Sequence, residues 1–171
     1  MLSGLVLFYV GAVLILNGLW MLGRIGDREI LVINLLVGLL SLRVAHEYAF
    51  GDGANLLTVR EATLSLLFSF TYLWVAWNRL LGNDGRGLGW FSLFVALTAG
   101  AVATELLWSA QDAWGWWQAA SWAAWAVLWL LYFAQLVLQK PWKRRVAWTA
   151  MAQGVFTGWL PGYWLLMQPA A

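Results

Sequence analysis

Six long apolar stretches constrain this 171-residue chain more than any other feature of its sequence. A helix needs about 20 mostly apolar residues to cross the hydrocarbon core of a membrane. The sequence therefore predicts six transmembrane helices, at about residues 3–22, 29–48, 62–82, 88–108, 115–138 and 146–167. Only 11% of the residues are charged, whereas a soluble domain carries about 25%. We predict an all-α integral membrane protein whose six helices form one bundle.

Short segments rich in turn-forming residues separate these stretches, and none is long enough to link two domains. We predict one transmembrane domain over residues 1–171, with Met1 in the mature first helix, because no basic region or cleavage site marks a signal peptide. Thr58 and Glu61 have the spacing of a capping box and are expected to open the third helix. Pro141 is expected to close the fifth helix, since proline cannot continue the hydrogen-bond ladder.

The basic residues predict the orientation of the chain in the membrane. Eight of the ten fall in the first, third and fifth loops: Arg24, Arg28, Arg79, Arg86, Lys140, Lys143, Arg144 and Arg145. The second and fourth loop regions hold only Arg43 and Arg60. By the positive-inside rule the odd loops are cytoplasmic, which places both termini outside, on the periplasmic face of a bacterial inner membrane.

Glycines recur at regular intervals in the first and last helices. They are seven residues apart at Gly4, Gly11 and Gly18, and four residues apart at Gly154, Gly158 and Gly162. Small residues at such spacings allow two helix backbones to approach closely in lipid. We predict close helix packing at these faces, with the partner helix in the same subunit or in a neighbouring one.

Few residues could support catalysis or bind a metal ion. His46 is the only histidine, it lies near the outer end of the second helix beside Glu47, and the chain has no cysteine. We interpret His46 as a solvated interfacial residue and expect Arg43 and Glu47 to pair along one helical face. The net charge of +2 is small, and the ten Lys and Arg residues are scattered through short loops, which gives nucleic-acid binding no support. We predict no catalytic residue, metal site or cofactor, and hence no enzyme.

The middles of the predicted helices hold no ionisable residue; the nearest, Glu105, falls in the last turn of the fourth helix. Proton- and ion-coupled transporters usually carry such residues there, at a cost of about 2.5 to 3.5 kcal/mol each. Their absence favours uncoupled, downhill movement.

Aromatic and amide residues fill the helix middles instead. Tryptophans near helix ends are typical of the interfacial belt, whereas Trp122, Trp125 and Trp129 run into the middle of the fifth helix along one face. Phe70 and Trp74 form a matching pair on the third helix. A third stripe, on the first helix, consists of Leu7, Val10, Leu14 and Asn17. Such stripes are often packing surfaces, but three of them can also line a pore.

Five amide residues lie within the apolar stretches: Asn17, Asn34, Asn78, Gln135 and Gln153. Each must find hydrogen-bond partners there, and we interpret Asn34 and Gln135 as ties between helices. Urea and acetamide are small, planar and neutral, so a slot between flat rings could hold them while an indole N–H or a side-chain amide replaces part of their hydration. An ion would lose a far stronger hydration shell without compensation.

The sequence resembles the AmiS/UreI family of urea and short-chain amide channels. The resemblance lies in the segments Gly4–Gly11 with Asn17, Leu67–Trp74, Gly89–Val95, Trp125–Trp129 and Phe156–Gly162. It implies a six-helix protomer with its own pore, assembled into a ring-shaped homo-hexamer. It further implies constrictions at Leu14, Asn17, Phe70, Trp74, Trp122, Trp125, Leu128 and Trp129, with Gln153 toward the cytoplasmic side and Leu7, Val10 and Asn78 flanking the pore.

One departure from the family pattern concerns gating. The acid-gated urea channels of the family carry long outer loops with histidines, whereas these loops are short and His46 stands alone. The chain therefore resembles the amide branch, whose members accompany a cytoplasmic amidase, and acid gating is not expected. Two alternatives stay open: a structural or accessory membrane subunit without a pore, and a proton-coupled amide transporter.

Overall fold

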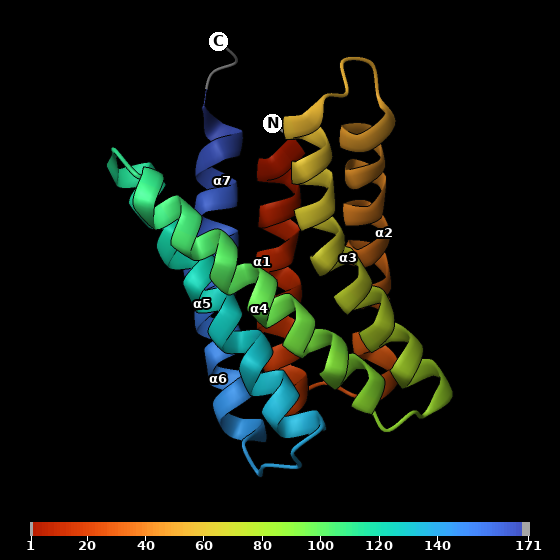
Figure 1. The fold of residues 1–171 in the computed structure, drawn as a ribbon. Coiled ribbons are helices and arrows are strands. Elements are labelled where there is room, and N and C mark those ends of the chain that lie inside the picture. Colours follow the sequence, from red (N-terminus) through yellow and green to blue (C-terminus); the bar gives the residue numbers. More distant parts are fainter. Residues whose placement is uncertain (1, 169–171) are drawn as a thin grey trace.

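A computed structural model describes residues 2–168, and within that range the chain is helical apart from short loops (Figure 1). The helices are α1 (Leu2–Met21), α2 (Asp27–Phe50), α3 (Leu56–Leu81), α4 (Arg86–Ser109), α5 (Ala113–Leu136), α6 (Lys143–Gln153), the π-helix η1 (Gly154–Trp159) and α7 (Leu160–Met167). The last three form one continuous helical stretch, because the junction residues Gly154 and Leu160 keep helical backbone angles. Met1, expected in the first helix, lies outside the described residues.

Four of these helices, α1, α2, α4 and α5, are long and apolar enough to cross a membrane. The helix α3 is long enough at 26 residues but includes Arg60, Glu61 and Arg79 near its ends. The final stretch begins with the basic residues 143–145 and is divided by the π-helix. The predicted segments thus all correspond to helical stretches, whose ends differ from the prediction by up to six residues.

Two predicted helix boundaries were wrong. The N-cap of α3 is Asn55, whose side chain accepts hydrogen bonds from the backbone N–H groups of Leu57 and Thr58, at 2.9 and 3.3 Å. Thr58 is the third residue of this capping box, and its hydroxyl accepts a hydrogen bond from the Asn55 N–H at 2.9 Å, so Glu61 is not part of it. The helix α5 ends at Leu136, several residues before Pro141, where Gln139 adopts a left-handed backbone with φ of 52°.

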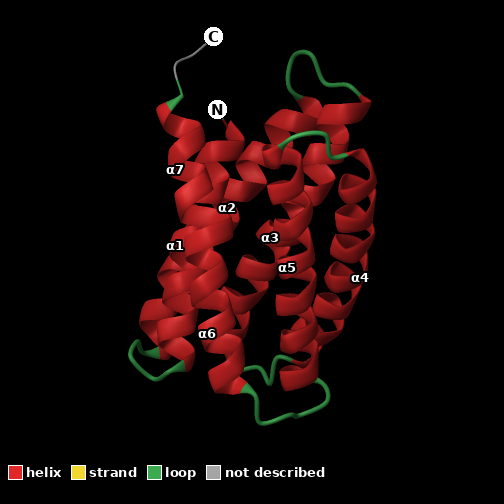
Figure 2. Cartoon of the chain, turned by 90° about the vertical axis from the view of Figure 1, so that its left-hand side faces the viewer, coloured by secondary structure: helices red, strands yellow, loops and turns green. Residues whose placement is uncertain are grey.

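The helices pack mainly as three antiparallel pairs: α2 with α3, α4 with α5, and α1 with the final stretch α6–η1–α7. Figure 1 shows α4 and α5 crossing the other helices obliquely, while in Figures 1 and 2 alike α1 begins and α7 ends at the same end of the bundle. We call this the acidic end, because it carries Glu47, Asp52, Glu61, Glu105 and Asp112. The opposite, basic end carries the eight Lys and Arg residues of the odd loops.

Close backbone contact between α1 and the final stretch confirms the prediction from the glycine spacing. A Cβ atom on Gly158 would lie 2.6 Å from Gly11 Cα, and one on Gly154 would lie 2.8 Å from the Gly11 carbonyl oxygen. Both distances are shorter than real Cβ contacts, so only glycine permits this approach. The partner helix of these glycines lies within the same subunit.

The π-helix lies just before Pro161, which has no N–H to donate to the carbonyl four residues earlier. The backbone shifts register there, and the Leu160 N–H instead donates to the Val155 carbonyl, five residues back. π-Helical turns of this kind frequently occur at functional sites. Here the turn carries Thr157, whose side chain faces α5.

Candidate functional site

Three cavities follow one another through the inside of the bundle, from the acidic end to the basic end. Their volumes are about 240, 20 and 50 Å³. The acidic-end and middle cavities share Phe68 and Trp125 as walls. The middle and basic-end cavities share Asn17, Val75, Leu88 and Tyr132. The three cavities thus lie next to one another inside one protomer, and the middle one is the smallest.

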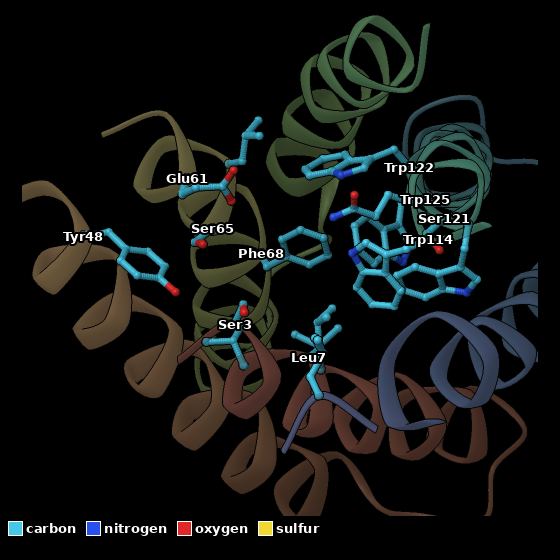
Figure 3. A pocket seen from close by; sticks show the side chains of 16 residues that line it. Ser3, Leu7, Tyr48, Glu61, Ser65, Phe68, Trp114, Ser121, Trp122 and Trp125 are labelled. Atoms are coloured by element: carbon cyan, nitrogen blue, oxygen red, sulfur yellow. The ribbon is translucent and has the colours of Figure 1, made fainter. Parts of the chain in front are cut away.

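The acidic-end cavity has two unlike sides (Figure 3). Ser3, Tyr48, Glu61 and Ser65, from α1, α2 and α3, lie on one side. The other side is mainly α5, which contributes Trp114, Trp117, Gln118, Ser121, Trp122 and Trp125. Leu7 and Val10, expected to flank the pore, also line this cavity. A planar solute entering here would lie between indole rings and oxygen-bearing side chains.

The middle cavity of about 20 Å³ has room for about one water molecule. It is enclosed by Leu14, Asn17, Phe68, Thr71, Tyr72, Val75, Leu88, Ser92, Trp125, Leu128, Trp129 and Tyr132. None of these described lining residues carries an ionic charge at neutral pH. Five of the predicted pore residues meet at this constriction: Leu14, Asn17, Trp125, Leu128 and Trp129. An amide larger than water can pass only if side chains here rearrange.

The constriction is closed by an aromatic cluster centred on Phe68. The Phe68 ring meets the edges or faces of three α5 indoles, with centroid distances of 6.1 Å to Trp122, 4.9 Å to Trp125 and 5.0 Å to Trp129. All three pairs are steeply inclined, which is a favoured geometry for aromatic rings. Phe68 itself is only 7% exposed. One side chain of α3 therefore holds the whole tryptophan stripe of α5.

Two of these indoles already have hydrogen-bond partners. The Trp125 Nε1–H donates to the Thr157 hydroxyl at 2.8 Å, and the Trp129 Nε1–H donates to the Thr71 hydroxyl at 3.3 Å. Both threonine hydroxyls donate in turn to carbonyls of their own helices, those of Gln153 and Leu67. The sequence had suggested that an indole N–H could replace part of a solute's hydration. These two N–H groups are already bonded and are not free to do so. They fix the orientation of the rings instead.

Asn17 and Asn34 form a reciprocal pair between α1 and α2. The Asn17 Nδ2 donates to Asn34 Oδ1 at 3.1 Å, and the Asn34 Nδ2 donates to Asn17 Oδ1 at 2.7 Å and to the Ile30 carbonyl at 2.9 Å. The prediction that Asn34 ties helices together is confirmed. Asn17 lines the constriction and is held in place by this pair.

Asn78, Arg79 and Gln135 line the basic-end cavity. Gln135 was expected to tie helices, but its buried Oε1 has no hydrogen-bond partner among residues 2–168. That oxygen can serve a solute or a water molecule instead. At the mouth, the Arg79 guanidinium lies 5.2 Å from the Trp20 ring centroid and 3.8 Å from Asp27.

Gln153 lines none of these three cavities. Its Nε2 donates to the Ala124 carbonyl of α5 at 2.7 Å, and its Oε1 has no partner within the described range. The side chain thus lies behind the tryptophan stripe and links α6 to α5.

Phe70 and Trp74 line none of the three cavities, so the expectation that they constrict the pore requires correction. They do share one face of α3, as their spacing predicts, but it is the outer face: their exposed fractions are 45% and 37%. There they pack against Phe91 of α4, with centroid distances of 6.5 and 5.8 Å.

The inner face of α3 is what the sequence reasoning missed. Phe68, Thr71, Tyr72 and Val75 occupy it at spacings of three and four residues. No residue of this face marked it as internal: the Thr71 hydroxyl donates to the Leu67 carbonyl of its own helix, as the exposed Thr104 does to the Gly100 carbonyl. Leu88 and Ser92 of α4 and Tyr132 of α5 were missed as well.

No group of three His, Asp or Glu side chains that could hold a metal ion occurs within residues 2–168. His46 is exposed at the acidic end, and its ring lies 5.3 Å from that of Phe50. It lines none of the three cavities.

Comparison with known proteins gives a consistent result. The sequence model of the AmiS/UreI family of transporters matches residues 2–169. A Mycolicibacterium smegmatis protein named as a transporter of amidate substrates is 40% identical over 94% of this chain and 75% of that protein. The acid-activated urea channel of Helicobacter pylori is 34% identical over 96% of this chain and 97% of that protein.

Solved structures of the same H. pylori channel share the fold. The cryo-electron microscopy structure of its closed state superposes with a TM-score of 0.85, covering 99% of this chain and 100% of the channel. Its crystal structure superposes with a TM-score of 0.84, covering 98% of both chains. The sequence identity is 34% in each case.

Proposed function

Because the chain belongs to the AmiS/UreI family of transporters, we propose that it is a passive channel for small neutral amides such as acetamide and urea. The observation that carries this proposal is the row of three adjacent cavities inside one protomer, which share lining residues. The middle cavity is the smallest, and its lining residues are uncharged. The relatives found are channels and transporters, which agrees with the absence of catalytic chemistry expected from the sequence.

The constriction explains the preference for neutral solutes. Its rings and hydroxyls suit a flat molecule with both polar and apolar surface, and Ser92 and Asn17 supply polar atoms beside Trp125, Leu128 and Trp129. A metal ion or a proton would find no ring of carbonyls and no buried charge at this constriction. Uncharged amides moving downhill require no such groups.

In the membrane, we propose that α1 to α5 and the stretch α6–η1–α7 make six crossings within a single domain. Four of them have the length and composition for this, and α3 and the final stretch run alongside them in the bundle. The excess of Lys and Arg supports an orientation with the basic end in the cytoplasm and the acidic end, with both termini, outside a bacterial inner membrane.

A homo-hexameric ring is the assembly we propose, each protomer keeping its own pore. The outer face of α3 and α4 supports a protein or lipid neighbour, since Phe70, Trp74 and Phe94 are all exposed there. Contact with a neighbouring protomer or with lipid would explain why these apolar residues are exposed, without any role in the pore.

Among substrates, we favour short-chain amides supplied to a cytoplasmic amidase, over urea supplied to a urease. The M. smegmatis relative aligns over 163 positions, and 94% of 171 residues is about 161, so the alignment is almost free of insertions. The alignment with the urea channel takes 192 positions for 96% of the chain, about 164 residues, so that channel carries many residues with no counterpart here.

Stopped-flow uptake by vesicles containing the purified protein tests this proposal. Acetamide and urea should enter faster than into protein-free vesicles, with little or no saturation. Collapsing a proton or sodium gradient should leave the rate unchanged. A rate that falls to the protein-free value when the gradient is removed would support a coupled transporter instead.

A further inference from the structure

The acidic-end cavity contains a carboxylate that the proposed passage of neutral amides does not require. Glu61 lines this cavity at the start of α3, and Figure 3 shows it on the side opposite the α5 tryptophans. Both arginines of the acidic end are already paired. Arg60 binds Glu105 through two hydrogen bonds of 2.8 and 2.7 Å, and Arg43 binds Glu47 at 2.8 Å. Among residues 2–168, Glu61 therefore has no cationic partner.

Across the cavity, indole rings offer a complementary surface for a cation. Trp114, Trp122 and Trp125 all line it from α5. The face of a tryptophan ring attracts ammonium and guanidinium groups within about 6 Å, most strongly where water is excluded. A cation between Glu61 and these rings would be attracted from both sides.

An unsatisfied buried hydroxyl lies on the same wall. Ser121 is only 2% exposed, it lines the cavity, and its Oγ has no hydrogen-bond partner within the described chain. Buried hydroxyls normally have a partner. With Ser65 and Tyr48 opposite, the cavity offers acceptor oxygens on both sides for the N–H groups of a flat ligand.

From this arrangement we infer that the acidic-end cavity is a binding site for small planar cations of the amidinium and guanidinium class. Such cations have the shape of acetamide and urea but carry a positive charge. The cavity of about 240 Å³ accommodates them, whereas the constriction of about 20 Å³ is lined by no charged residue that could compensate for the hydration a cation loses. These cations therefore bind in the acidic-end cavity without crossing the constriction, and they compete with amides for entry to the pore.

Acetamidinium, the cationic counterpart of acetamide, is the probe for this site. Calorimetric titration of the purified protein should show saturable binding, and Glu61→Gln should weaken it about fivefold, as expected for loss of one partly solvated charge pair. Asp52→Asn is the matched control: it removes the same charge from the same end, at a residue outside the cavity. Binding should be unchanged in this variant. Non-saturable binding, or equal weakening in both variants, would overturn the site.

The blocking part rests on the proposed function and is measured separately. External acetamidinium should slow acetamide uptake by vesicles, with a half-inhibitory concentration that rises about fivefold in Glu61→Gln when each variant is scaled to its own uninhibited rate. Acetamidinium that enters vesicles as fast as acetamide would refute the block. If acetamide uptake itself does not exceed that of protein-free vesicles, the proposed function fails, and the titration still decides whether the cation site exists.

Discussion

Thr157 illustrates how single residues of this protein fix the pore lining. Its hydroxyl accepts the Trp125 Nε1–H and donates to the Gln153 carbonyl, each within a buried setting. A threonine on the π-helix thereby sets the plane of an indole at the constriction. Residues that touch no solute can determine the width of the path in this way.

Replacing Thr157 by valine should therefore lower stability, because the buried Trp125 N–H would lose its acceptor at a cost of about 1 to 3 kcal/mol. Thermal unfolding in detergent measures the effect. Thr63→Val is the matched control, since the Thr63 hydroxyl is exposed and bonds only the Val59 carbonyl of its own helix. Equal losses in the two variants would show that the Trp125 bond contributes nothing.

Sequence patterns identified the lining of α5 but not that of α3. The three tryptophans of α5 share one face without a competing stripe, so their spacing pointed to the interior. The helix α3 has aromatic residues on two faces, Phe68 with Tyr72 inside and Phe70 with Trp74 outside. Spacing groups the residues of each face but cannot choose between faces, because lipid and core are both apolar.

At the scale of whole helices, the contact of α1 with the final stretch depends on glycine. A methyl group on Gly158 would meet the Gly11 backbone, which cannot yield as a flexible side chain would. The glycine spacing predicted this contact. The π-helix was not predicted, since it depends on how the backbone around Pro161 settles against α1 and α5.

Gly158→Ala should consequently lower the unfolding temperature, at a cost of about 1 to 3 kcal/mol for overpacking. Gly100→Ala provides the control, because a Cβ at Gly100 of α4 would meet no atom within 4 Å. Alanine is the better helix former, so this change should be neutral or stabilising. A Gly158→Ala protein as stable as Gly100→Ala would show that the close approach is dispensable.

At the scale of the whole molecule, the position of His46 predicts how the channel responds to pH. It is exposed, lies at the acidic end and lines none of the three cavities. Amide permeability should accordingly change little between about pH 7 and pH 5, the range in which histidine titrates. Uptake by vesicles at both values tests this. A several-fold rise on acidification that is lost in His46→Ala would identify a proton sensor.

The apolar stretches predicted the helical bundle, and the lack of ionisable residues in the helix middles favoured a passive path, because both patterns extend over many residues. The constriction could not be predicted in the same way. It arises where α1, α3, α4 and α5 converge, and its width depends on rotamers such as that of Phe68, which tertiary contacts decide.

The most direct test of the account is the size selectivity of two neighbouring α3 variants. Phe68→Ala removes the ring that holds the tryptophan stripe, so it should widen the constriction and let butyramide enter at a rate closer to that of acetamide. Phe70→Ala removes the same group from the outer face and should leave selectivity as in the wild type. Phe68→Ala should in either case lose about 3 to 5 kcal/mol of stability, because it truncates a buried ring. Unchanged selectivity in that destabilised but folded protein would contradict the proposed pore.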